Sequence, residues 1–283
     1  NFRPLVVCNQ HGDKIHTMNY ILPVLVTIFV WWFSTGVVLL LNRLPQRTHI
    51  PNLLITILLA LTSVYALVET RSVTTPLAVY QAFVAAIIIW GWLELAFLYG
   101  VITGPRREAC PDGVSSARRF WLAFQALAYH EIAILCALIL VAIICWNAPN
   151  QAGLWTFFVL FAMRLSAKLN IFLGVPHMNE DFLPERLDFL KSYFARRSMN
   201  WFFPVSVTVS MLVGAYVFHE AFSFGAADYE VVVYMLTGTL ILLGTLEHWL
   251  LILRIPDSEL WRWAMRQNEI DHKDTRKDTV EYK

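Results

Sequence analysis

The stretch YILPVLVTIFVWWFSTGVVLLL, residues 20–41, decides the fold class, because it contains no charged side chain. A helix that crosses a bilayer needs about 20 consecutive, mostly apolar residues. No run alternates apolar and polar residues as the strands of a membrane barrel do. The sequence therefore predicts an all-α integral membrane protein, a bundle of seven transmembrane helices. The expected spans are 20–41, 51–68, 76–100, 121–146, 153–173, 204–222 and 230–253.

The composition agrees with a membrane protein and excludes several other classes. Of 283 residues, 57% are hydrophobic and only 15% are charged, whereas a soluble domain carries about 25% charged residues. The net charge of +1 offers no overall basic field for nucleic acid. The four cysteines form neither a C-x-x-C pair nor a regular framework, which excludes disulfide-rich secreted folds and zinc ribbons.

The basic residues predict the orientation of the chain in the membrane. Only three Lys or Arg lie in the N-terminal segment and the connections on its side, whereas 17 lie in the other connections and the C-terminal segment. Cytoplasmic connections are enriched in Lys and Arg. We therefore expect a periplasmic N-terminus, a cytoplasmic C-terminus and lipid-bilayer contact along residues 18–264.

Both ends of the chain differ from the membrane domain in composition. Residues 1–17 are polar and precede Met18, which favours an N-terminal extension from an overlong start. Residues 265–283 mix acidic and basic side chains with few apolar ones. Such a composition cannot bury enough apolar surface to fold, so we expect a disordered cytoplasmic tail.

Polar side chains inside the predicted spans indicate a buried site. Each ionisable group within a span costs about 2.5–3.5 kcal/mol on insertion scales, so such groups are functional candidates when they face the bundle interior. At about 1.5 Å of rise per residue, those on four different spans reach similar depths in the half nearer the predicted cytoplasmic side. The predicted polar layer contains Glu94, His130, Glu131, Arg164, Lys168, Asn170, Glu247 and His248.

Three interpretations of this layer stay open. In the first, the layer is an ion-pair network in which Arg164 and Lys168, one turn apart on one helix face, neutralise two of the three carboxylates. In the second, the layer is a divalent-metal site, although adjacent His-Glu pairs depart from the Glu-x-x-His template of di-iron bundles. The candidate metal ligands are Glu94, His130, Glu131, Glu247 and His248. Alternatively, it contacts a pigment, with His130 or His248 as an axial ligand.

The long connection 174–203 contains a second candidate surface. From Pro184 onward, apolar residues recur at helical spacing, which predicts an amphipathic helix on the cytoplasmic membrane surface. The alternative is a plain connector packed on the bundle. The candidate residues for contact with a partner or with the membrane surface are Arg106, Arg107, Leu187, Leu190 and Phe194.

Several strings in the chain are distinctive. Residues 90–94 read WGWLE, residues 163–170 read MRLSAKLN, and residues 260–263 read LWRW. Together with His130-Glu131 and Glu247-His248-Trp249, they resemble the PuhE family of photosynthetic complex assembly proteins of purple phototrophic bacteria. The resemblance implies a multi-pass protein of the bacterial inner, or intracytoplasmic, membrane, encoded near the reaction-centre H subunit. It carries over no catalytic residues.

The resemblance and the polar layer lead to two functional hypotheses. In the first, the protein is an assembly factor without catalytic activity that supports formation of the reaction centre and light-harvesting complexes and the supply of bacteriochlorophyll. Its partners are then subunits of these complexes or pigment-synthesis proteins, and its candidate ligand is bacteriochlorophyll or a precursor. In the alternative, it is a membrane metalloenzyme, an oxidoreductase that acts on a tetrapyrrole intermediate through a divalent metal at the Glu/His site.

Overall fold

The computed structural model describes residues 10–177, 183–254 and 260–265. Every regular element in these residues is a helix, and seven helices are long and apolar enough to cross a membrane. The prediction of an all-α protein with seven spans is confirmed, whereas the orientation of the termini stays a prediction. The seven are α1 (Gln10–Arg43), α2 (His49–Thr70), α3 (Pro76–Leu98), α4 (Ser116–Ile144), α5 (Ala152–Leu173), α6 (Phe202–Ala221) and α7 (Asp228–Leu250).

Three short helices complete the described elements: η1 (Gln46–Thr48), η3 (Glu185–Tyr193) and α8 (Arg262–Met265). Of the predicted polar extension 1–17, residues 1–9 lie outside the described part, and α1 has already begun at Gln10. The predicted charged tail also lies outside the described residues from position 266 onward.

Polar residues in the connections define where several helices begin. The side chains of Thr75 and Ser115 accept hydrogen bonds from backbone N–H groups in the first turns of α3 and α4. The side-chain oxygen of Asn200 accepts from the backbone N–H groups of Phe202 and Phe203, at 2.9 and 3.0 Å. These N–H groups have no partner within their own helix, so the capping side chains stabilise each helix start.

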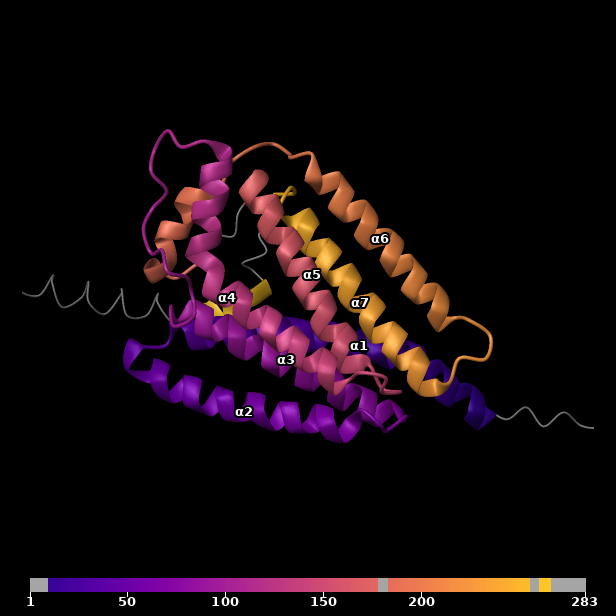
Figure 1. Ribbon diagram of the computed structural model, residues 1–283. Coiled ribbons are helices and arrows are strands. Elements are labelled where there is room, and N and C mark those ends of the chain that lie inside the picture. The colour runs from indigo at the N-terminus through magenta and orange to yellow at the C-terminus, as the bar shows by residue number, and fades with distance from the viewer. Residues whose placement is uncertain (1–9, 178–182, 255–259, 266–283) are drawn as a thin grey trace, which may run out of the picture.

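Helices α3 and α7 form the centre of the bundle. About two thirds of their apolar segments are buried inside the protein, 61% and 67%, whereas the other five helices bury 17–28%. Helices α1 and α5 each pack against both central helices, while α2 packs on α3 and α6 packs on α7. Figure 1 shows α2 and α6 at opposite edges of the bundle. Their outward faces are apolar, as contact with lipid requires.

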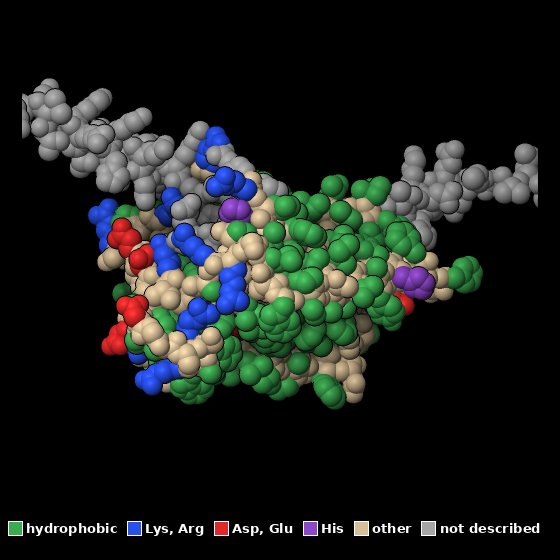
Figure 2. Space-filling model, turned by 90° about the horizontal axis from the view of Figure 1, so that it is seen from above, with side chains coloured by type: hydrophobic (Ala, Val, Ile, Leu, Met, Phe, Trp, Pro, Cys, Tyr) green, Lys and Arg blue, Asp and Glu red, His purple; other side chains and the backbone are tan. Residues whose placement is uncertain are grey.

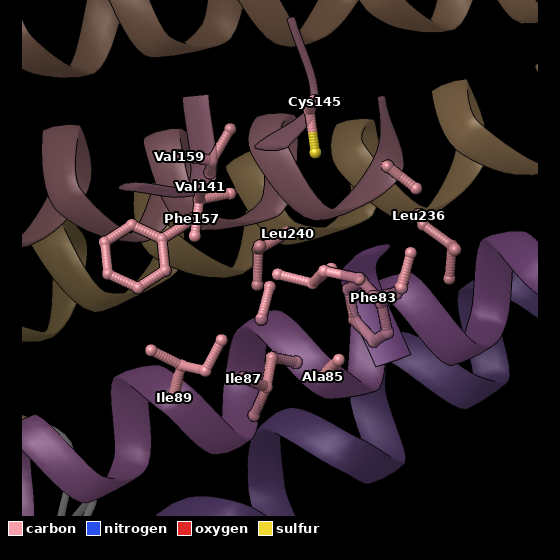
Figure 3. Close-up of a cluster of buried hydrophobic side chains, with 14 of the residues drawn as sticks. Phe83, Ala85, Ile87, Ile89, Val141, Cys145, Phe157, Val159, Leu236 and Leu240 are labelled. Carbon is pink, nitrogen blue, oxygen red and sulfur yellow. The ribbon is translucent and has the colours of Figure 1, made fainter. Parts of the chain in front are cut away.

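One half of the bundle has a closely packed hydrophobic core. Phe83 of α3, Phe157 of α5 and Val141 of α4 are fully buried, and Leu236 of α7 is 1% exposed. Figure 3 shows these side chains between the helices, together with Ile87 and Leu240 of the same cluster. We call this cluster the dense core; its members include Phe83, Ala86, Val141, Phe157, Val232 and Leu236.

The opposite half ends in long, charged connections. Figure 2 shows Lys and Arg side chains gathered at one end of the molecule, whereas hydrophobic side chains cover much of the remaining surface. We call the end formed by the connections 99–115 and 174–201 the basic end. In Figure 1, α5 and α7 diverge from α3 toward this end.

Helix α4 bends near the basic end, although it contains no proline (Figure 1). The backbone carbonyl of Thr103, in the preceding connection, accepts a hydrogen bond from the backbone N–H of His130 at 3.0 Å. Gly104 lies so close to α4 that an added methyl group would overlap the carbonyl of Gln125. A group that inserts into a helix ladder bends the helix, and here it places His130 beside α3.

Candidate functional site

The bundle contains a cavity of about 410 Å³ between the dense core and the basic end. Helices α1, α3, α4, α5 and α7 line it. Leu190 and Tyr193 of η3 line it at the basic end, and Trp261, next to α8, lines it against α1. The volume falls in the range of about 300–1,000 Å³ that is usual for small-molecule sites.

Four charged side chains line this cavity: Glu94, Arg164, Lys168 and Glu247. The side chain of Arg164 keeps 46% of its surface accessible, and Glu247 is exposed as well. Both residues line the cavity, so accessible surface of each faces it. Four of the eight residues predicted for the polar layer therefore face one internal space.

Two ion pairs connect α5 to its neighbours. A guanidinium nitrogen of Arg164 lies 3.3 Å from a carboxylate oxygen of Glu94 on α3. The Lys168 ammonium lies 2.6 Å from the carboxylate of Glu131 on α4. Lys168 and Glu131 are only 20% and 19% exposed. Because a buried charge is costly without a partner, these pairs hold α3, α4 and α5 in register.

Glu247 differs from the other two carboxylates in its partner. Its Oε1 atom accepts a hydrogen bond from the indole N–H of Trp31 on α1, at 2.8 Å. In the described part of the chain, no Lys, Arg or His nitrogen lies within 4.0 Å of the Glu247 carboxylate. The cavity is thus lined by one carboxylate that no cation of the described residues contacts directly.

The two histidines of the predicted layer are buried away from the cavity. His130 is fully buried, its ring stacks on Phe97 at 4.5 Å between centroids, and its Nε2 lies 4.0 Å from Glu94. His248 is 1% exposed; its Nδ1 lies 2.7 Å from the carbonyl of Gly244, and its Nε2 lies 2.9 Å from the Ser166 hydroxyl. Neither histidine lines the cavity, so neither presents a ring nitrogen there as an axial ligand.

The structure does not gather the five candidate metal ligands at one point. Glu131 is engaged by Lys168, His248 is engaged by Ser166 and Gly244, and Glu94 is engaged by Arg164. Within residues 10–177, 183–254 and 260–265, no three His, Cys, Asp or Glu side chains form a group that could hold a metal ion. The physical reason is that adjacent residues point about 100° apart on a helix, so His130 and Glu131 face different neighbours.

Asn170, the remaining member of the predicted layer, belongs to the junction of α5 and α6. Its amide nitrogen donates to the Ser206 hydroxyl at 3.1 Å, and its side-chain oxygen accepts from Asn200 at 3.1 Å. Asn170 is fully buried. It therefore connects two helices and does not line the cavity.

The connection after α5 requires a correction. Residues 185–193 form the 3₁₀-helix η3, and Leu187 and Leu190 are 1% and 5% exposed. They pack with Tyr193 against Phe97, Leu98, Leu122 and Ala126, so the prediction that Leu187 and Leu190 face the membrane surface or a partner is wrong. The reason is their spacing of three, which places all three side chains on one face of a 3₁₀-helix.

The other residues predicted for that surface, Arg106, Arg107 and Phe194, differ in how far they are exposed. Phe194 is half-buried and packs against the same cluster as Leu190. Arg106 donates from Nε to the Tyr193 hydroxyl at 2.8 Å, which joins the two long connections of the basic end. Arg107 is exposed and donates to the carbonyl of Gly100 at 3.1 Å. Of the five, Arg107 alone is exposed.

Two tryptophans of the site were not among the predicted site residues. Trp31 contacts Glu247, and Trp261 is buried in the cavity wall, where its indole N–H donates to the carbonyl of Trp32 at 3.0 Å. The sequence interpretation assigned such residues to the aromatic belts at the membrane interfaces. Trp31 lies in the middle of the run 20–41, far from an interface, and this position is the signal that marks it as an interior residue.

The chain belongs to the family described as "Protein of unknown function (DUF3623)", which matches residues 17–272. It is 40% identical over 246 residues to an "Uncharacterized 30.4 kDa protein in puhA 5'region" of Rhodobacter capsulatus, covering 85% of this chain and 89% of the relative. No solved structure matches the chain. The gene location of the relative fits the resemblance noted above, although neither description uses the name PuhE.

Proposed function

We propose that this member of the DUF3623 family is an assembly factor for photosynthetic complexes in the bacterial inner membrane. It supports formation of the reaction centre and light-harvesting complexes and the supply of bacteriochlorophyll. The location of the relative's gene in the puhA 5' region supports this role, because the resemblance places such proteins beside the gene of the reaction-centre H subunit. The partners are subunits of these complexes or pigment-synthesis proteins, and the basic end faces the cytoplasm.

The observation that carries the proposal is the cavity of about 410 Å³ inside seven apolar helices. A bundle that only anchors a protein has no need for interior space with charged walls, because each charge inside a membrane is costly. A protein that holds a pigment or another apolar guest during assembly needs such a space. We therefore assign the cavity as the place where the guest is held.

The metalloenzyme alternative has less support. It requires at least three of Glu94, His130, Glu131, Glu247 and His248 at one ion. In the described residues, Lys168 engages Glu131, and Ser166 and Gly244 engage His248. A holding role uses the cavity as it stands, without rearranging these contacts.

The test fills the cavity without disturbing the fold. Gly91 lines the cavity, and a Cβ added there meets only a methyl group of Val38, at 3.8 Å. Gly91→Phe therefore places a phenyl ring in the cavity. Leu58→Phe is the matched control, because Leu58 lies on α2 and is 62% exposed on an outer, apolar face. Each variant gene replaces the chromosomal copy in a phototrophic host, and the resulting strains are compared with the wild type and with a strain that lacks the gene.

We expect Gly91→Phe to reach the wild-type protein level by immunoblot, but to lower the absorption of assembled complexes as far as the deletion does. Leu58→Phe should match the wild type in both measurements. Normal complexes in the Gly91→Phe strain would contradict a holding role for the cavity. Normal complexes in the deletion strain would contradict the assembly function itself.

A further inference from the structure

The cavity walls contain two carboxylates and two cations, but the polar layer as a whole is not balanced. With both histidines neutral and the carboxyl groups ionised, the layer contains three carboxylates, Glu94, Glu131 and Glu247, and two cations, Arg164 and Lys168. Arg164 and Lys168 each pair with one carboxylate. The described part of the layer therefore has one negative charge in excess, and Glu247 is the carboxylate without a directly contacting cation.

Two buried members of the layer lack hydrogen-bond partners among the described residues: the Oε1 atom of Glu94 and the ring nitrogens of His130, whose Nε2 lies 4.0 Å from that oxygen. These atoms have no accessible surface, so a molecule in the cavity does not reach them. Glu247 receives one hydrogen bond, from Trp31 to Oε1, and a carboxylate has room for about four. An acceptor that lacks donors is costly away from water, so the acceptor that the cavity offers to a donor group is Glu247.

An anionic guest does not fit this arrangement. It would add a second uncompensated negative charge inside the membrane, where each charge is costly. Although Arg164 is accessible from the cavity, its charge already compensates Glu94 at 3.3 Å. A guest with a cationic or neutral donor group instead satisfies Glu247.

The position of the apolar wall indicates where the rest of the guest lies. Ile87 and Leu240 line the cavity seven residues before Glu94 and Glu247 on their helices. At 1.5 Å per residue, this places them about 10 Å from the polar layer, toward the dense core. Leu160 of α5 lines the same region. The cavity therefore has a polar end and an apolar end.

We propose that the cavity binds an amphipathic molecule whose apolar body, about 10 Å long, lies toward Ile87 and Leu240 and whose polar end donates hydrogen bonds to Glu247 and carries no negative charge. This assignment of ligand chemistry does not depend on the role in photosynthetic assembly. It concerns only which molecules the cavity accepts.

The test uses three probes of equal chain length and different head-group charge: octylamine, octanol and octanoate. The full chain is embedded in phosphatidylcholine nanodiscs at neutral pH, where the amine is cationic and the acid is anionic. The midpoint of thermal unfolding is followed against probe concentration, because a ligand that binds the folded state raises this midpoint. Wild type, Glu247→Gln, Gly91→Phe and the control Leu58→Phe are compared with the same probe, so that partition into lipid cancels.

We expect the wild-type protein to bind octylamine about tenfold or more tightly than octanoate, the factor that a charge-assisted hydrogen bond provides. Glu247→Gln keeps an oxygen for Trp31 but removes the charge, and should lower octylamine affinity about tenfold. Gly91→Phe should abolish stabilisation by octylamine and octanol, whereas Leu58→Phe should behave as the wild type.

Tighter binding of octanoate, or equal binding of the amine and the acid, would overturn the proposal. So would unchanged octylamine binding in Gly91→Phe, because the probe would then lie outside the cavity. If Glu247→Gln does not fold, the order of the three probes in the wild type and the Gly91→Phe result still decide the proposal. None of these outcomes depends on complex assembly in the host.

Discussion

The two halves of α3 and α7 are built in different ways. Toward their first turns, Val79 and Phe83 of α3 meet Val232 and Leu236 of α7 in the dense core, where each is at most 1% exposed. Toward the basic end, the same two helices present Glu94 and Glu247 to a cavity. Lipid tails are as apolar as leucine, so helices in a membrane associate by close packing. The dense core therefore stabilises the bundle, and the other half leaves an open cavity between the helices.

The largest expected effect compares a leucine buried within the dense core with one that packs on this core and borders the cavity. Leu236→Ala removes a side chain that is 1% exposed and should lower the free energy of unfolding by about 3–5 kcal/mol, since it leaves a new void. Leu160→Ala should cost about 1 kcal/mol, because Leu160 borders an existing cavity and loses fewer contacts. Unfolding in detergent micelles with increasing sodium dodecyl sulfate measures both. Equal losses would remove the distinction between the two halves.

The next effect compares the two ion pairs. Lys168→Met leaves Glu131 unpaired at 19% exposure and should cost about 3 kcal/mol. Arg164→Met should cost a similar amount, about 3 kcal/mol, because Glu94 is only 13% exposed and loses the cation that pairs with it. Adding Glu131→Gln to Lys168→Met should restore about half of the loss. The same unfolding assay tests this, and a double variant as unstable as Lys168→Met would argue against the pair.

The smallest effect compares two helical glycines. In the dense half, a Cβ on Gly153 would overlap the Leu67 side chain and lie 3.4 Å from the carbonyl of Ala82, so Gly153→Ala should destabilise by about 1–2 kcal/mol. In the cavity half, Gly91→Ala meets only Val38 at 3.8 Å and should be neutral or stabilise by up to about 1 kcal/mol through helix propensity. The unfolding midpoints of the two variants test this difference. A destabilised Gly91→Ala would show that the cavity is narrower than described.

Helix geometry explains which features of the site the sequence could predict. The polar layer was predicted from depth alone, and Glu94, Arg164, Lys168 and Glu247 indeed line one cavity. The predicted metal-ligand set mixed residues that point in different directions. Glu247 lines the cavity, whereas its neighbour His248 contacts Ser166 and Gly244. Depth can be counted along a chain, but the direction of a side chain depends on which helices surround it.

The connection at the basic end shows the same limit for local structure. Leu187, Leu190 and Tyr193 recur every three residues, a spacing compatible with an α-helix or a 3₁₀-helix. Burial against Phe97 and Leu122 selects the 3₁₀-helix and turns these side chains inward. The same apolar residues fit a membrane surface or a protein core. The sequence alone therefore could not show whether this segment lies on the membrane surface or packs against the bundle.

The sequence by itself determined that the protein lies in a membrane, that it has seven spanning helices, and at what approximate depth the polar residues lie. Each of these properties follows from the length of the apolar runs and a constant rise per residue. Only the tertiary structure decided which carboxylates are paired, which histidines are buried, and that α5 and α7 diverge from α3 to leave a cavity. These features depend on contacts between segments far apart in the chain, such as Trp31 with Glu247. A single run of residues does not contain that information.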